Sequence, residues 1–256
     1  MKILKFKKQS KDKYKLYLDN NSDITLYEDV IIKNNLLITK EISDELLEAL
    51  KKQNNDMYAY TLALGYISVK MRSIKEINDY LIKKGFNNLV ANKVSERLIK
   101  EGYLNDLKYA KSFINDSMNL TNKGPQKIKL ELIKYGVNKD IIESEIALID
   151  QRKVEEKLNR LIDKELKIKK GSQNAIKIKL INHFVNLGYS KNLVTSILTG
   201  KEISSDKSKL KKDYAKLYNK YKVKYSEQEL LYFISQKLYS KGYTASDIKE
   251  VLKEEN

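Results

Sequence analysis

The sequence contains no cysteine, a single proline and a single histidine in 256 residues. Without cysteine, the chain has no disulfide framework, no thiol nucleophile and no thiolate metal ligand, which is compatible with a reducing cytoplasm. His183 has no second histidine or cysteine to share a metal with, so we expect it to pack or to lie on the surface. One proline and nine glycines beside abundant lysine, leucine, isoleucine and glutamate predict a mostly helical protein.

Long apolar runs are also absent. The longest stretch free of charged residues, 57–69, is 13 residues long, whereas a transmembrane helix needs roughly 20. Residues 1–8 are partly basic but precede no apolar segment, so they do not form a secretory signal. We therefore expect no membrane span and a cytoplasmic protein.

No arrangement of catalytic residues is visible either. Glu155 and Glu156 are adjacent carboxylates, but helical neighbours point about 100° apart and do not converge on one substrate atom. Glycine-rich phosphate loops, metal-ligand spacings and nucleophile elbows are missing. We predict a protein that is not an enzyme and uses no cofactor or metal.

The chain does contain a fourfold repeat. Glycines recur at Gly85, Gly136, Gly188 and Gly242, spaced 51, 52 and 54 residues apart, and each precedes an apolar or aromatic residue such as Phe86. Apolar residues lie eight and four positions before each glycine: Ile77 and Leu81, Ile128 and Leu132, Leu180 and Phe184, and Ile234 and Leu238. A fixed period of this size is typical of a repeat array, in which each unit packs against its neighbours.

Each repeat is predicted to contain three helices, with the middle helix ending at its glycine in a left-handed C-cap. Ser73 and Glu76 form a capping box at the start of the first middle helix, and Ser226 begins a similar one in the fourth repeat. The second middle helix starts at Gly124 and Pro125, because proline suits the first helical position. The residue after each glycine, Phe86 in the first repeat, is expected in the core.

The first fifty residues differ from the rest. Tyr14, Leu16 and Leu18 alternate with polar residues, a polar turn follows, and apolar residues continue as far as Ile32. This pattern predicts a small antiparallel sheet. The period becomes helical at Ser43, and the polar residues 51–55 are predicted to form a linker.

The predicted fold is therefore mainly α, a tandem array of four helix-turn-helix-like repeats forming an elongated, curved solenoid after a small N-terminal β element. The predicted segments are 1–50, which holds the strands and a helix, and the repeats 57–104, 105–150, 151–205 and 206–256.

The net charge of +16 is distributed unevenly. Basic residues exceed acidic ones by 10 to 5 over 51–104, 12 to 5 over 151–205 and 12 to 8 over 206–256, while 105–150 is balanced at 7 to 7. An AT-rich genome explains the preference for lysine over arginine but not a neutral second repeat. We favour a polyanionic partner over a merely soluble basic surface.

Two basic segments are candidate partner- or DNA-binding sites. The first comprises Lys164, Lys167, Lys169, Lys170, Lys177 and Lys179 around Gly171, and the second comprises Lys70 and Arg72 beside a helix start. A glycine loop with lysines and the amide groups of a helix start both suit a phosphate. A solvated charge run accounts equally well for the first segment, and an exposed turn is the preferred interpretation of the second.

Four tyrosines in the last repeat have helical spacing. Tyr214, Tyr218, Tyr221 and Tyr225 are interleaved with lysines, a combination that suits base stacking on a cationic surface. The spacing of three and four residues is nevertheless more typical of a core stripe, which we expect here.

Several of these motifs together resemble the RecX family, bacterial regulators of the RecA recombinase. The motifs are Arg72-Ser73 with Glu76-Ile77, Lys84-Gly85-Phe86, Gly102-Tyr103-Leu104-Asn105-Asp106, Tyr109-Ala110 with Phe113, Lys123-Gly124-Pro125 with Ile128, Glu131-Leu132 and Gly136-Val137. The chain is similar to the longer Gram-positive type, which has an N-terminal sheet and an extra C-terminal repeat. The family usually has paired aspartates where Asn105 and Asp106 stand; either residue type caps a helix, but a role that needs two negative charges is in doubt.

The resemblance implies a protein that binds the RecA filament on single-stranded DNA, limits its growth, and suppresses ATP hydrolysis, strand exchange and co-protease action. Lysine-rich faces are expected to meet phosphates of single-stranded DNA, with double-stranded DNA as a further target, and we expect a monomer. One alternative is a helix-turn-helix DNA-binding protein, transcriptional or architectural, although the third helices share no base-reading residues. A passive scaffold is the third interpretation.

Overall fold

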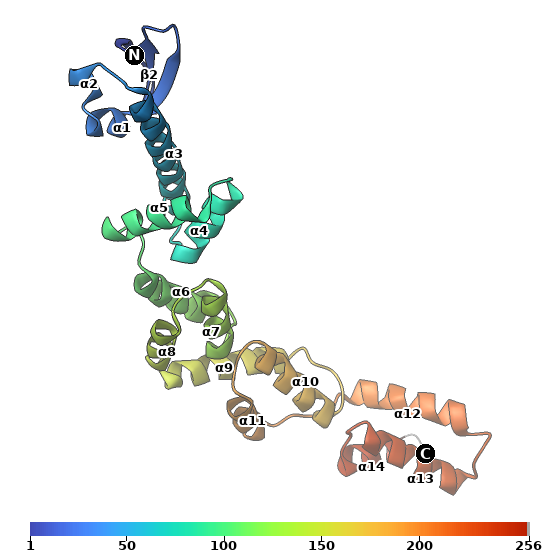
Figure 1. The fold of residues 1–256 in the computed structure, drawn as a ribbon. Helices are drawn as coiled ribbons and strands as arrows, with labels where there is room; N and C mark the ends of the chain where they lie inside the picture. The colour runs from blue at the N-terminus through green and yellow to red at the C-terminus, as the bar shows by residue number, and fades with distance from the viewer. Residues whose placement is uncertain (255–256) are drawn as a thin grey trace. The chain divides into compact units, whose positions relative to one another are not determined.

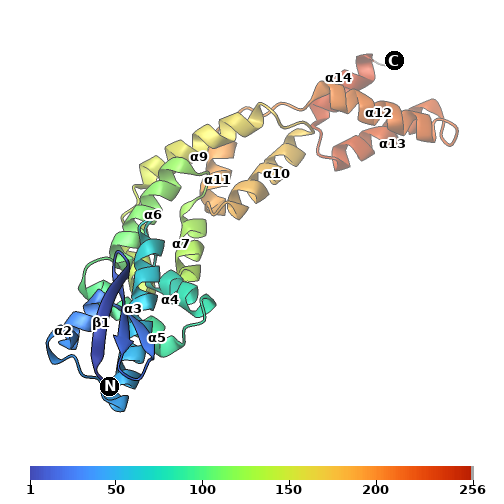
Figure 2. The same ribbon diagram turned by 90° about the horizontal axis from the view of Figure 1, so that it is seen from above.

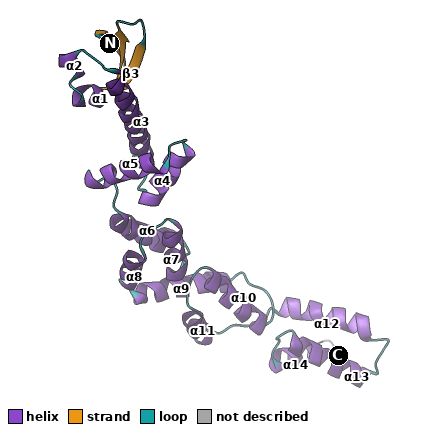
Figure 3. Ribbon diagram, in the orientation of Figure 1, coloured by secondary structure: helices purple, strands orange, loops and turns teal. Residues whose placement is uncertain are grey.

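In a computed structural model that describes residues 1–254, the chain forms three strands and fourteen helices. Figure 1 shows these elements as a ribbon coloured along the chain. The chain divides into two compact units. The first unit contains residues 1–110 with 134–138, and the second contains 111–133 with the chain from 139 onward. The strands are confined to the N-terminal part, and the remainder is helical (Figure 3). The predicted mainly α repeat protein with a small N-terminal sheet is confirmed, while the predicted segment boundaries stay predictions.

The N-terminal sheet consists of β1 (Ile3–Ser10), β2 (Lys13–Leu18) and β3 (Asp23–Tyr27), antiparallel in the order β1-β2-β3. Leu16, Leu18 and Leu26 are buried beneath it. The expectation that the apolar residues up to Ile32 continue the sheet is wrong. They belong to α1 (Glu28–Lys33), whose first turn carries two acidic residues and which buries adjacent residues, as a helix but not a half-buried strand does. A short helix, α2 (Leu36–Thr39), follows.

A single long helix, α3 (Asp44–Ile67), connects the sheet to the first repeat and runs through residues 51–55. The predicted linker is therefore wrong. Polar side chains in this segment bond to the N-terminal sheet instead: Asn54 accepts a hydrogen bond from the Tyr27 amide at 2.9 Å and donates one to the Thr25 carbonyl at 3.1 Å. Gln53 accepts a hydrogen bond from the Asn34 side chain at 2.8 Å. The Asn54 side chain thus satisfies backbone groups of β3 that no further strand covers.

Each repeat has the predicted three helices, with α3 serving as the first helix of repeat one. The others are α4 (Ile74–Lys83) and α5 (Asn88–Lys100); α6 (Asp106–Leu120), α7 (Pro125–Lys134) and α8 (Lys139–Ala147); α9 (Gln151–Leu166), α10 (Gln173–Asn186) and α11 (Lys191–Thr199); α12 (Lys207–Tyr221), α13 (Glu227–Ser240) and α14 (Ala245–Glu254). In the fourth repeat α12, α13 and α14 pack together (Figure 2). The four middle helices are α4, α7, α10 and α13, and each ends at its repeat's glycine.

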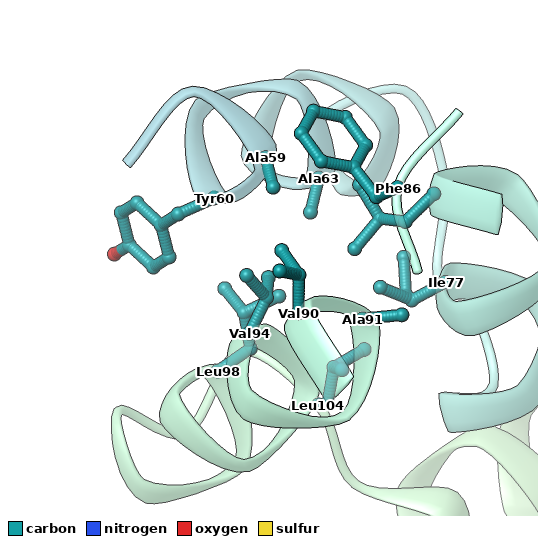
Figure 4. Packing of buried hydrophobic residues seen from close by; sticks show 11 residues of the cluster. Ala59, Tyr60, Ala63, Ile77, Phe86, Val90, Ala91, Val94, Leu98 and Leu104 are labelled. Atoms are coloured by element: carbon teal, nitrogen blue, oxygen red, sulfur yellow. The ribbon is translucent and has the colours of Figure 1, made fainter. Parts of the chain in front are cut away.

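The first repeat shows how these helices make a core (Figure 4). Ala59 and Ala63 on α3 face Val90 and Val94 on α5, and the small alanines let the two helices approach closely. Phe86, the residue after the glycine, is 9% exposed and packs into the same cluster. Its predicted core position is confirmed.

Successive repeats are joined at the ends of their middle helices. The glycine turn that ends one middle helix lies on the start of the middle helix in the preceding repeat. The Ser73 hydroxyl donates to the Tyr135 carbonyl at 2.7 Å, and the Ser172 hydroxyl donates to the Lys241 carbonyl at 2.6 Å. Between these two joints, the Gly124 amide donates to the Leu187 carbonyl at 2.7 Å. The first joint explains why residues 134–138 belong to the first compact unit.

The repeated glycines are required for two reasons. All four have positive φ, as a left-handed C-cap demands. At Gly188 a Cβ atom would also lie 2.3 Å from the Lys127 amide nitrogen, and at Gly124 it would lie 2.6 Å from the Gly188 carbonyl carbon. A Cβ at Gly85 would meet nothing within 4 Å among the described residues, so this glycine turn makes no such joint.

Gly85 and Gly188 have nearly the same backbone conformation, with φ of +94° and +93°, but only Gly188 lies at a joint. Substituting each in turn therefore separates the effect of the joint from that of the backbone strain. We predict that Gly85→Ala costs only the left-handed strain, about 1–2 kcal/mol, or a few degrees in Tm. Gly188→Ala carries the same strain and in addition forces the joint apart, so its loss of Tm should be at least twice as large. Thermal unfolding followed by circular dichroism measures both, and equal losses would show that the joint contributes nothing.

Candidate nucleic-acid interface on the third repeat

Amide groups at the starts of α4 and α10 form hydrogen bonds within the protein. At the start of α4, the Ile74 amide donates to the Asp106 carboxylate at 3.0 Å, and the Glu76 amide donates to the Ser73 hydroxyl at 3.2 Å. At the start of α10, the Gln173 amide donates to the Ser205 hydroxyl at 3.1 Å. The Ile74 and Glu76 amides beside Lys70 and Arg72 are therefore not free for a phosphate, and the exposed-turn interpretation of that segment is favoured.

Arg72, one of the candidate residues, makes contacts within the fold. Its guanidinium carbon lies 3.8 Å from the centre of the Tyr66 ring, and its Nη1 lies 3.2 Å from a Glu76 carboxylate oxygen. The side chain is only 11% exposed. Arg72 thus links the end of α3 to the start of α4, whereas its neighbour Lys70 is exposed. A partner-binding role for either residue stays a prediction.

The third repeat carries a stripe of basic residues along α9. Lys153, Lys157, Arg160, Lys164 and Lys167 follow one another at intervals of three or four residues, which places them on one face of the helix and its C-terminal turn. Sequence reasoning identified Lys164 and Lys167 but missed Lys153 and Arg160. They could have been found by following the same spacing of three or four residues back toward the start of α9.

This face of α9 lines two adjoining grooves. One, of about 740 Å³, is bounded by residues of α6, α8 and α9, and the other, of about 430 Å³, continues along α9 to Lys167. Glu156 and Arg160 line both grooves, so the basic stripe follows one continuous depression. An elongated groove edged by cations is a suitable shape for a nucleic-acid strand.

The exposed cations of the stripe are unpaired. Lys153, Arg160, Lys164 and Lys167 are exposed and form no ion pair within the described part of the chain. Three other lysines nearby are neutralised: Lys169 pairs with Glu165 at 2.9 Å, Lys201 with Asp163 at 2.7 Å and Lys111 with Glu145 at 3.7 Å. Lys170, Lys177 and Lys179 form no ion pair within residues 1–254, but they do not line this groove. Unpaired cations are the ones that neutralise phosphates most readily.

The remaining predicted lysines are not all on this surface. Lys167, Lys169 and Lys170 line a further hollow of about 390 Å³, which shares Lys167 with the α9 groove and also contains Glu202 and Asp206. Lys177 and Lys179 are two residues apart on α10, so they point to different sides of that helix. Lys164 and Lys167 thus line one groove with Arg160, and neither Lys177 nor Lys179 is among the residues that line it.

Lys157 is the buried member of the stripe. Its ammonium group donates to the Lys123 carbonyl at 3.0 Å and to the Ser117 carbonyl at 3.4 Å. Burial, reinforced by the nearby Arg160 charge, lowers the pKa of Lys157 to about 8. This lysine ties the third repeat to the second and adds to the positive charge beneath the groove.

The tyrosines of the last repeat and His183 pack against other side chains of the protein. Tyr214 is buried, and Tyr221 packs on Phe233, as a core stripe requires. Tyr218 and Tyr225 are each 39% exposed to solvent. His183 is on the surface of α10 with its ring edge-to-face against Phe184.

Asn105 and Asp106 have separate roles at the start of α6. Asn105 accepts a hydrogen bond from the Lys108 amide at 2.9 Å and so caps the helix as expected. The neighbouring Asp106 carboxylate accepts the Ile74 amide hydrogen bond, and burial raises its pKa. Of these two residues, only Asp106 has a carboxylate, and it contacts the start of α4.

Two further properties are negative findings for residues 1–254. No group of three histidine, cysteine, aspartate or glutamate side chains is placed to hold a metal ion. In the same residues, no helix combines the length and apolar character needed to cross a bilayer.

Comparison with known proteins links these repeats to one family. Residues 59–98 match a family model described as the first three-helix domain of RecX, and residues 105–144 match the second. The chain is 35% identical to the regulatory protein RecX of Streptococcus uberis over 99% of both chains, and 26% identical to that of Staphylococcus haemolyticus over 98% of this chain and 96% of the other. A crystal structure of a regulatory protein RecX has a TM-score of 0.68 at 22% identity, covering 77% of this chain and 98% of that one.

Lys157 predicts a pH dependence of stability. Between pH 8 and 10.5 the unfolded chain binds a proton at this residue that the folded chain has lost, so the unfolding free energy rises with pH. We expect a rise of about 2 kcal/mol between pH 7.5 and 9.5, which Lys157→Met should abolish and the exposed control Lys153→Met should preserve.

Above pH 10 the trend should reverse. The pKa values of Tyr60 and Tyr189 are raised to about 12, mainly by burial, so these phenols ionise earlier in the unfolded chain and stability falls. Urea unfolding at a series of pH values tests both the rise in stability below pH 10 and the fall above it. A rise below pH 10 that persists in Lys157→Met would contradict the assignment to Lys157.

Proposed function

Because the chain belongs to the RecX family of regulatory proteins, we propose that it regulates RecA by binding the RecA filament on single-stranded DNA. Binding would limit filament growth and so suppress ATP hydrolysis, strand exchange and co-protease action, without catalysis by the regulator. The relationship to RecX proteins over nearly the full chain carries this proposal.

The way the repeats are joined supports a role in binding extended partners. The joints use the ends of the middle helices and their backbone groups. These hydrogen bonds do not involve the outward side chains of the first and third helices, which stay available for a partner. An array with several free faces suits a polymeric partner that presents many identical subunits.

We infer two kinds of contact with the filament. Protein contacts are primary, as the family relationship suggests, and phosphate contacts are secondary and come from the α9 stripe. Lys153, Arg160, Lys164 and Lys167 are the residues assigned to the phosphates, because they are exposed, unpaired and aligned along one groove.

The alternative of a helix-turn-helix DNA reader has less support. In the first repeat, Asn92 on α5 accepts a hydrogen bond from Asn78, and Lys93 pairs with Asp56. In the second repeat, Glu143 on α8 pairs with Lys129 at 3.2 Å. Side chains that would read base edges are thus engaged within the protein and differ between repeats.

The deciding experiment adds the purified protein to RecA assembled on single-stranded DNA and follows ATP hydrolysis together with filament length. We expect hydrolysis to fall and filaments to shorten as the protein is titrated. Unchanged hydrolysis at saturating protein would contradict the proposed function.

The α9 stripe predicts salt-dependent DNA binding. Changing Lys153, Arg160, Lys164 and Lys167 to glutamine should weaken binding to an oligo(dT) strand and reduce the slope of log K against log salt by about 0.7 for each phosphate that is no longer neutralised. The matched control changes the exposed residues Lys212, Lys216, Lys222 and Lys224 of the fourth repeat to glutamine, which removes the same charge. Equal weakening in both variants would show that net charge, and not the groove, determines binding.

A further inference from the structure

The middle and third helices of the first two repeats are bridged by side chains at equivalent positions. These positions lie seven residues before and seven residues after the repeat glycine. In repeat one the Asn78 amide donates to the Asn92 side chain at 3.2 Å, and in repeat two Lys129 pairs with Glu143 at 3.2 Å. In repeat three the first position is Ile181, which packs against the core of its repeat.

The fourth repeat lacks this bridge. Its equivalent residues are Ser235 on α13 and Lys249 on α14. The Ser235 hydroxyl donates to the Leu231 carbonyl of its own helix at 2.7 Å, and Lys249 forms no ion pair within residues 1–254. A groove of about 750 Å³ lies between the two helices at this point, here called the α13–α14 groove.

The α13–α14 groove has an apolar surface with cations along one side. Its lining residues are Ser235, Gln236, Tyr239, Ala245, Ile248, Lys249, Leu252 and Lys253. Tyr239 is 65% exposed, although it is aromatic. The two lysines are four residues apart on α14, so they project from the same side of the helix.

Pairing on the other side of α14 leaves these lysines without counterions. Glu250 pairs with Lys207, and Glu254 pairs with Lys211 at 2.7 Å, which holds both carboxylates toward α12. Lys249 and Lys253 remain unpaired at the groove within the described residues. Helix α14 therefore presents carboxylates to α12 and lysines to the α13–α14 groove.

We propose that the α13–α14 groove binds an acidic amphipathic helix of a partner protein. The apolar residues of such a helix would cover Tyr239, Ala245 and the exposed part of Leu252, and its carboxylates, four residues apart, would pair with Lys249 and Lys253. A protein segment fits better than a nucleic acid, because the lining includes the exposed Tyr239 and Ala245 and only two cations. The proposal does not depend on RecA being the partner.

The test measures fluorescence anisotropy of a labelled synthetic peptide of about sixteen residues, with glutamates four apart beside a stripe of leucines, titrated with the full chain. Lys249→Glu with Lys253→Glu should raise Kd at least tenfold. The control, Lys212→Glu with Lys216→Glu on α12, changes the net charge equally and keeps the same spacing, and should leave Kd within twofold.

A second variant closes the groove instead of reversing its charge. Ser235→Glu places a carboxylate opposite Lys249, as Glu143 stands opposite Lys129 in the second repeat. Binding of the peptide should be lost while the helical circular dichroism and Tm are retained. Tyr239→Ala, at an exposed position, should also raise Kd without changing the Tm.

Three results would overturn the proposal. The first is equal binding of a peptide in which glutamine replaces every glutamate. The second is an equal fall in affinity in the α12 control, and the third is displacement of the peptide by an oligo(dT) strand at a lower concentration than by unlabelled peptide.

Discussion

The hydrogen bonds between the end of one middle helix and the start of another are the constraint on which the rest of the structure depends. The first amide groups of a helix have no partner within that helix. Here the next repeat supplies carbonyl groups to them, directly at Gly124 and through the serine caps at Ser73 and Ser172. Because a side chain would block the approach at Gly188, glycine serves both the helix end and the joint.

This use of helix ends determines where a polyanion can bind. Anion sites often form at helix starts, but the starts of α4 and α10 are filled by groups of the protein. We therefore assign phosphate contacts to side chains on a helix face, and the unpaired cations of α9 are a well-aligned set. The fourth repeat differs again: its open groove combines apolar surface with two cations, and we assign it a protein partner. Nucleic acid and protein would thus be bound by different repeats of one chain.

The repeat, its three helices and its glycine C-caps were predictable because they depend on local pattern: spacing, capping and the need for positive φ at residues such as Gly85. The joints were not, because Gly188 and Lys127 are brought together only by folding. Asn54 was mistaken for part of a linker since its partners lie on a strand far earlier in the chain. At the candidate site, Lys169 was taken for a free cation although Glu165 lies four residues before it, a pairing that the sequence does contain. Lys153 and Arg160 were missed because they lie outside the densest lysine cluster.

The most direct test of the joints is amide hydrogen exchange measured by NMR on the intact protein. The amides of Gly124 and Gln126 donate to carbonyls of the third repeat, at 2.7 and 3.0 Å, and should exchange slowly although they lie at a helix start. The amides of Glu227 and Gln228 begin α13, where no hydrogen bond from another repeat is present within residues 1–254, and should exchange rapidly. Equal exchange rates at the two helix starts would contradict the joint as the interaction that holds the array together.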